Sequence, residues 1–173
     1  GLKAQPAQSN YGSGGIGTSA HLAGATLASL AGLQVTHIPL KGSVEIAASL
    51  IRGDTQYAFP VAGTGIPQVQ GGKLRALAVT SRKRLAQLPE VPTLQEVLGS
   101  ELAVQESWFG LWAPARTPPA VVERLHAAGR QAAAQPALRA SFEAVGNEAF
   151  ADFVRSENRK WAAIIELAGK AGE

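Results

Sequence analysis

The chain has 173 residues, of which 46% are hydrophobic and 17% charged, and its formal net charge is +3. This composition is typical of a soluble globular protein, and the absence of cysteine excludes disulfides, thiolate metal sites and cysteine nucleophiles. The dense basic cluster Arg82, Lys83 and Arg84 has no interleaved aromatic residues, which favours a solvated turn over a nucleic-acid surface. No segment is apolar enough for a membrane span, and residues 1–6 do not resemble a signal peptide, so we expect any export signal to have been removed.

Strands alternate with helices in the first part of the chain. The first helix is predicted over residues 18–31, because an apolar pattern follows Thr18 and ends at Gly32. The other predicted elements are strands at 8–11, 34–40, 55–59 and 74–80, helices at 43–52 and 93–98, and a short helix or turn at 64–70. The helix at 43–52 is predicted to have its N-cap at 42–43. This alternation predicts an α/β fold with a mainly parallel sheet covered by helices on both faces.

Three loops follow the carboxyl ends of the first three predicted strands, at residues 11–17, 39–43 and 59–64. In open parallel sheets ligands bind at the carboxyl ends of the strands. We therefore expect the three loops to converge on one binding site.

The first of these loops is rich in glycine and hydroxyl side chains. Residues 12–21 read Gly-Ser-Gly-Gly-Ile-Gly-Thr-Ser-Ala-His, directly before the first helix. Glycines let the backbone approach a ligand, and the first N–H groups of a helix have no internal partner, so the segment suits a carboxylate or phosphate. Ser13, Thr18 and Ser19 can contact the anion or cap the helix. His21 and Lys41 fit either a ligand contact or an ordinary packing or surface role.

A second unit is predicted after residue 104. It begins with a strand at 104–113, whose Trp108 and Trp112 we expect in the core rather than in the site. Helices are predicted at 119–134, with Thr117 as the N-cap, and then at 136–145 and 149–168.

Five passages together carry a family resemblance. They are residues 10–22, 37–43 (His-Ile-Pro-Leu-Lys-Gly-Ser), 72–81 (Gly-Lys-Leu-Arg-Ala-Leu-Ala-Val-Thr-Ser), 89–93 (Pro-Glu-Val-Pro-Thr), and 107–111 (Ser-Trp-Phe-Gly-Leu) with 113–114. In this order and spacing they resemble the substrate-binding proteins of tripartite tricarboxylate transporters, the Bug family, over nearly the whole chain.

The resemblance implies a type II periplasmic-binding-protein architecture. Such a protein closes over a small carboxylate between two domains and delivers it to the membrane components of a transporter, without chemistry and without a cofactor or metal. It implies that residues 1–104 form ligand-binding domain 2 and residues 105–173 the C-terminal part of domain 1. It also implies a periplasmic location. A dicarboxylate, an amino acid and an aromatic acid all remain open as ligands.

The residues expected to contact the ligand come from all three loops. They are Ser13, Gly14, Gly15, Gly17, Thr18, Ser19, His21, Lys41, Gly42, Ser43, Pro60 and Val61. Pro60 and Val61 depart from the family, which usually has an acidic and an amide residue there, and residues 145–149 are shorter than the family's loop. Family members also carry a further segment before this point, so we expect weak binding and self-association of this chain through exposed apolar surface.

Two other classes of function remain as alternatives. The first is a dinucleotide-binding oxidoreductase fragment, because residues 12–17 fit G-x-G-x-x-G; however, the preceding strand is polar and no acidic residue ends the second strand to hold a ribose. The second is an interaction module without a ligand. The glycine segment does not fit a P-loop, because the required lysine does not follow it. A hydrolase or metal site is not indicated either, because no nucleophile motif or metal-ligand spacing is present and the histidines at 21, 37 and 126 are dispersed in the sequence.

Overall fold

The structure, a computed structural model, describes residues 9–107 and 110–144. Its sheet has three parallel strands, β1 (Asn10–Ser13), β2 (Thr36–Pro39) and β3 (Tyr57–Ala58), in the order β2-β1-β3. The register sets Tyr11 opposite His37 on one side and opposite Tyr57 on the other. The α/β prediction is confirmed. β1 begins two residues later than predicted. β2 and β3 are shorter than predicted because β1, the central strand, offers them only four residues of backbone.

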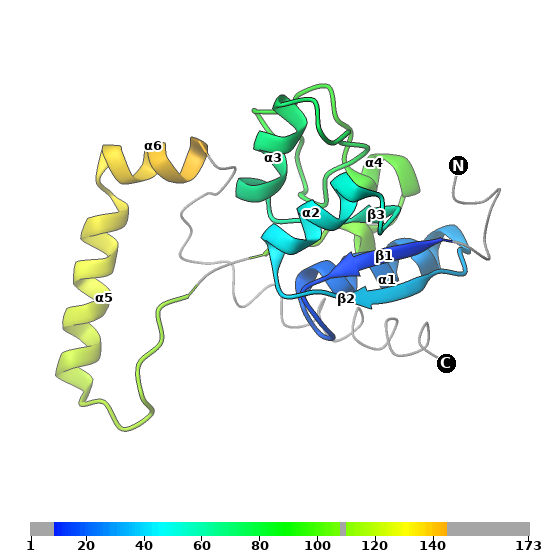
Figure 1. The fold of residues 1–173 in the computed structure, drawn as a ribbon. Coiled ribbons are helices and arrows are strands. Elements are labelled where there is room, and N and C mark those ends of the chain that lie inside the picture. The colour runs from blue at the N-terminus through cyan, green and yellow to red at the C-terminus, as the bar shows by residue number, and fades with distance from the viewer. Residues whose placement is uncertain (1–8, 108–109, 145–173) are drawn as a thin grey trace.

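Helices lie on both faces of the sheet. α1 (Ser19–Ala31) connects β1 to β2, and α2 (Ser43–Arg52) connects β2 back across β1 to β3. Crossovers between parallel strands are right-handed, so two connections that run in opposite directions put their helices on opposite faces. Figure 1 shows this arrangement, with α1 behind the sheet and α2 above it. α3 (Ala62–Gln70) follows β3 and packs on α2.

The ends and the packing of α1 follow from a few side chains. The Thr18 hydroxyl accepts a hydrogen bond from the His21 N–H at 3.3 Å, and Gly32 ends the helix in the left-handed region with φ of 63°. Within the helix, a Cβ atom on Gly24 would lie 3.0 Å from Cζ of Tyr11 and closer still to two other carbons of that ring. Gly24 therefore lets α1 lie directly against β1.

The strand predicted at residues 74–80 is wrong. Only Val79 pairs, through an isolated parallel bridge to Thr93. Burial alternates only over residues 74–78, where Ala76 packs on a buried apolar cluster while Leu77 is 67% exposed. A strand also needs a neighbouring backbone along its length, and the described part of the chain supplies one only at the end of this segment, where Val79 bonds residues 92 and 94 and the Thr80 carbonyl accepts from the Gln105 N–H.

The next elements connect the body to the second unit. α4 (Leu94–Leu98) begins at Thr93, whose hydroxyl accepts from the Glu96 N–H at 3.1 Å, as predicted for a short helix here. The 3-10 turn η3 (Glu101–Ala103) follows and contacts α1. After it, the buried Gln105 amide donates to the Thr26 hydroxyl of α1 at 2.8 Å. This hydrogen bond ties the departing chain to the first helix.

Two helices follow this segment. α5 (Pro119–Ala133) and α6 (Pro136–Ala144) confirm the predicted helices, and Figure 1 shows α5 standing apart from the sheet and its helices. The end of α6 meets the body, where the Gln87 side-chain amide donates a hydrogen bond to the Glu143 carbonyl. No residue of α5 is buried, and among the described elements α5 contacts mainly α6. None of the described helices is long and apolar enough to cross a bilayer.

Two expectations for this second unit are wrong. Thr117 does not cap α5: the N-cap is Pro118, and the Thr117 N–H instead bonds the Pro114 carbonyl in a turn. Trp112 is 78% exposed rather than in the core, and residues 104–107 and 110–113 form no strand. Trp108, the segment 145–149 and the helix predicted at 149–168 lie outside the described residues.

Candidate functional site

The predicted anion loop connects β1 to α1. Gly15 and Gly17 have φ values of 114° and 80°, in the region that favours glycine, and nothing lies within 4 Å of the position where either would carry a Cβ. The loop therefore presents bare backbone to solvent at the carboxyl edge of the sheet. This is the geometry that close approach of a ligand requires.

Ser13 holds the loop in place from beneath. Its side chain is fully buried, and its hydroxyl oxygen accepts a hydrogen bond from the Gly15 N–H at 3.1 Å. The same oxygen lies 2.6 Å from Nε2 of His37 on β2. Ser13 therefore positions the loop, and its hydroxyl does not face solvent.

The remaining hydroxyls of the loop also have partners. Thr18 caps α1 and donates its hydroxyl hydrogen to the Gly15 carbonyl at 2.7 Å. Ser19 accepts a hydrogen bond from the hydroxyl of Ser107 at 2.8 Å. Ser107 belongs to the segment that leaves the body after η3, so this segment lies next to the start of α1.

Backbone donors at the start of α1 remain available. The N–H groups of Gly14, Ile16, Ser19 and Ala20 have no hydrogen-bond partner among residues 9–107 and 110–144. No acidic residue occupies the first turn of α1. These donors lie at the positive end of the helix dipole, which favours an anion.

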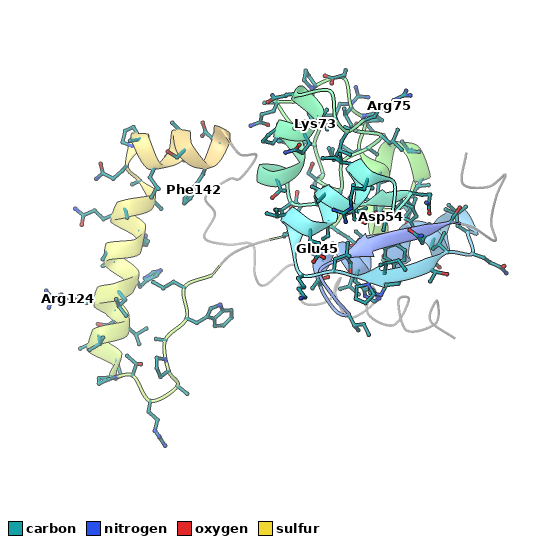
Figure 2. All side chains as sticks on the ribbon, in the orientation of Figure 1. Glu45, Asp54, Lys73, Arg75, Arg124 and Phe142 are labelled. Carbon is teal, nitrogen blue, oxygen red and sulfur yellow. The ribbon has the colours of Figure 1, made fainter. Side chains whose placement is uncertain are left out.

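The start of α2 is different, because it already carries a carboxylate. Glu45 lies in its first turn, and Oε2 of Glu45 accepts a hydrogen bond from the backbone N–H of Lys41 at 2.6 Å. Figure 2 shows Glu45 at this end of α2. The charge of Glu45 opposes a second anion there, so α1 is the better anion site of the two helices.

The structure brings the three predicted loops together. A Cβ on Gly14 would lie 3.7 Å from Cα of Gly42, which puts the first two loops in contact. The Ser43 hydroxyl accepts a hydrogen bond from the Val61 N–H at 3.1 Å, which joins the second loop to the third. The convergence predicted from the strand ends is therefore confirmed.

A group of aromatic and imidazole rings supports the loop. Tyr11 on β1 lies 5.0 Å from His37 and 5.4 Å from Tyr57, and the His21 and His37 rings are 4.5 Å apart, centroid to centroid. Burial lowers the pKa of both histidines, and His21 lowers that of His37 further. Burial also raises the pKa of Tyr11 to about 12 and that of Tyr57 further. All four rings are therefore neutral near pH 7.

His37 is the residue of this region that sequence reasoning left out of the site. It precedes the predicted second loop and lies opposite Tyr11 in the sheet, two residues before the position opposite Ser13. The sequence did contain a signal for His37, because it is the first residue of one of the passages that carry the family resemblance. Its contact with Ser13 depends on strand pairing, which the local pattern does not specify.

A shallow surface hollow lies elsewhere on the body. It is lined in part by Leu74, Leu77 and Pro92 and contains none of the predicted site residues. Figure 2 places Lys73 and Arg75 at this end of the body, away from Glu45. No group of three or more metal-binding side chains occurs in the described ranges 9–107 and 110–144.

Comparisons with known proteins identify the family. Residues 1–169 match the model of the tripartite tricarboxylate transporter family receptor. The chain is 39% identical over 178 residues to the UPF0065 protein in gbd 5'region of Cupriavidus necator, covering 98% of this chain and 53% of that protein. Two solved structures are similar: an R. palustris protein with adipate (25% identity, TM-score 0.86, 97% of this chain and 58% of that one) and the periplasmic binding protein BugD (28%, 0.86, 99% and 59%).

The chain belongs to the tripartite tricarboxylate transporter receptor family, whose members are substrate-binding proteins of the periplasmic-binding-protein type. It spans about half the length of the Cupriavidus relative and less than two thirds of each of these two solved structures.

Proposed function

We propose that this chain carries a carboxylate-binding site of an extracytoplasmic solute-binding protein, and that residues 14–20 hold the carboxylate. The observation that supports this proposal is the set of unpartnered N–H groups at the start of α1, in a loop of bare backbone with no acidic residue nearby in the helix. The similar R. palustris structure with adipate agrees with a carboxylate ligand.

We propose the same role for the other predicted site residues and for the protein as a whole. The second and third loops, with Lys41, Gly42, Ser43, Pro60 and Val61, form the border of the site next to the anion loop. The protein binds and does not catalyse, it works in the periplasm, and it delivers its ligand to the membrane components of a transporter. Residues 1–104 and 105–173 belong to the two different domains that close on the ligand.

A backbone amide titration tests the proposal. Acetate is added to the ¹⁵N-labelled chain while its amide resonances are followed by NMR, which detects millimolar affinities. We expect saturable shifts at residues 14–20 and none at the start of α2. Shifts with NAD but not with any carboxylate would instead support dinucleotide binding, and shifts spread evenly over the surface would contradict a specific site.

A pair of serine variants links the binding to the loop. Ser13→Ala removes the hydroxyl that holds the Gly15 N–H, and we expect acetate to bind about five- to tenfold more weakly, the equivalent of one lost hydrogen bond. Ser49→Ala is the control, because Ser49 is equally buried but its hydroxyl contacts Thr55, outside the three loops. Equal losses in both variants would show that Ser13 acts only through stability.

A further inference from the structure

Three exposed aliphatic side chains surround the anion loop. Ile16 is 86% exposed, Val44 is 77% exposed and Val61 is 38% exposed. Ile16 and Val61 come from the first and third loops at the carboxyl edge of the sheet, and Val44 lies in the first turn of α2, directly after the second loop. We call these three residues the apolar rim.

The apolar rim belongs to one surface. Ile16 lies in the anion loop, two residues from Gly14, which is in contact with Gly42. Val44 follows Ser43, whose hydroxyl holds the Val61 N–H at 3.1 Å. The strand order β2-β1-β3 changes direction between β1 and β3, and ligands of such sheets lie in the crevice at this point. The loops after these two strands carry Ile16 and Val61.

Some of the polar groups on the second and third loops are already used within the protein. The Val61 N–H is used by Ser43, and Pro60 has no N–H. The Lys41 N–H is used by Glu45, whose own charge repels a further carboxylate. The third loop carries no charged side chain between residues 59 and 64. The side chain of Lys41 is the one cation in the three loops.

We infer from this arrangement that the ligand is a carboxylate with an apolar body, which is either an aliphatic chain or an aromatic ring. The anion loop holds the carboxylate, and the apolar rim contacts the apolar body. This inference rests on the proposed function. Ligand sites commonly combine a mostly apolar lining with a few placed polar groups, which is what these three loops provide. Exposed aliphatic residues gathered around a polar cradle are otherwise unfavourable in water.

A ligand series measures the contribution of the apolar rim. Acetate, propionate, butyrate and hexanoate are titrated into the labelled chain, with malate as the hydroxylated dicarboxylate. Because each methylene group that becomes fully buried is worth about a fourfold gain, we expect affinity to rise by up to about fourfold per methylene along the series. We also expect butyrate to bind more tightly than malate. Equal affinity along the series, or tighter binding of malate, would overturn the inference while leaving carboxylate binding intact.

A matched pair of valine variants assigns the effect to the rim. Val61→Asn should flatten the dependence on chain length, so that the loss of affinity grows from acetate to hexanoate, because the substitution makes the rim polar. Val97→Asn is the control, since Val97 on α4 is 58% exposed and lies outside the three loops. An unchanged dependence in Val61→Asn, or the same loss in both variants, would contradict the role of the rim. If no carboxylate shifts the amide resonances of residues 14–20, the proposed function itself is contradicted.

Discussion

Replacing Gly24 by alanine tests how α1 is seated on the sheet beneath the anion loop. The added Cβ would lie 3.0 Å from Cζ of Tyr11 and closer to two neighbouring ring carbons, where ordinary contacts begin near 3.4 Å. Tyr11 is 4% exposed and stacked between His37 and Tyr57, so its ring cannot turn aside. Overpacking of this kind costs about 3 kcal/mol at the upper end of its usual range, and alanine in a helix regains about 1 kcal/mol over glycine. We expect the free energy of unfolding to fall by about 2 kcal/mol.

Urea unfolding followed by far-ultraviolet circular dichroism measures this change, with Gly129→Ala as the control. Gly129 lies in α5 with nothing within 4 Å of its Cβ position, so alanine there should be neutral or slightly stabilising. Tyr11→Leu in the Gly24→Ala background should recover part of the lost free energy of unfolding, because the smaller side chain relieves the clash. A double-mutant cycle separates this recovery from the cost of Tyr11→Leu in the unmodified chain. A stable Gly24→Ala variant, or a cycle with no coupling, would refute the close contact between α1 and β1.

Two further predictions concern pH and helix capping. Burial lowers the pKa of His21 and His37 below 6.5 in the folded chain. As the pH falls below 6.5, the unfolded chain therefore binds protons at these histidines before the folded chain does, and the free energy of unfolding falls. Above pH 6.5 these groups contribute no pH dependence. His37→Gln should reduce this slope in urea unfolding between pH 5 and 7, and an unchanged slope in variants of both histidines would contradict the burial effect. Thr93→Val removes the cap on the Glu96 N–H while keeping the shape of the side chain, and should cost about 1 kcal/mol of unfolding free energy. Thr117→Val, at a threonine that caps nothing, should cost close to nothing, and equal costs would argue against capping by Thr93.

Much of the body could be predicted because its signals are local. The hydroxyl of Thr18 and the αL glycine at position 32 define α1 from residues within one turn of each end. Gly53 ends α2 in the same way. The glycines of the anion loop stand directly before the helix that they serve, so their role follows from adjacent residues.

The errors of prediction occur where a partner distant in sequence decides the structure. Residues 74–80 have the composition expected of a strand but find neighbouring backbone only at their end, at Thr93 and Gln105. Trp112 has the character of a core residue, but the described elements do not cover it. A pattern of side chains shows what a segment can bury, whereas the partner that buries it is set by the rest of the fold.

The sequence by itself determined the class of the fold, the family and the position of the anion loop, since each depends on residues that are adjacent or regularly spaced. Only the tertiary structure decided how the loop is held and bordered. The contact of His37 with Ser13, the hydrogen bond from Val61 to Ser43 and the carboxylate of Glu45 at α2 all depend on it. The physical reason is that the pairing of β1 with β2 and β3 places three loops side by side, and side-chain hydrogen bonds between loops form only after that pairing exists.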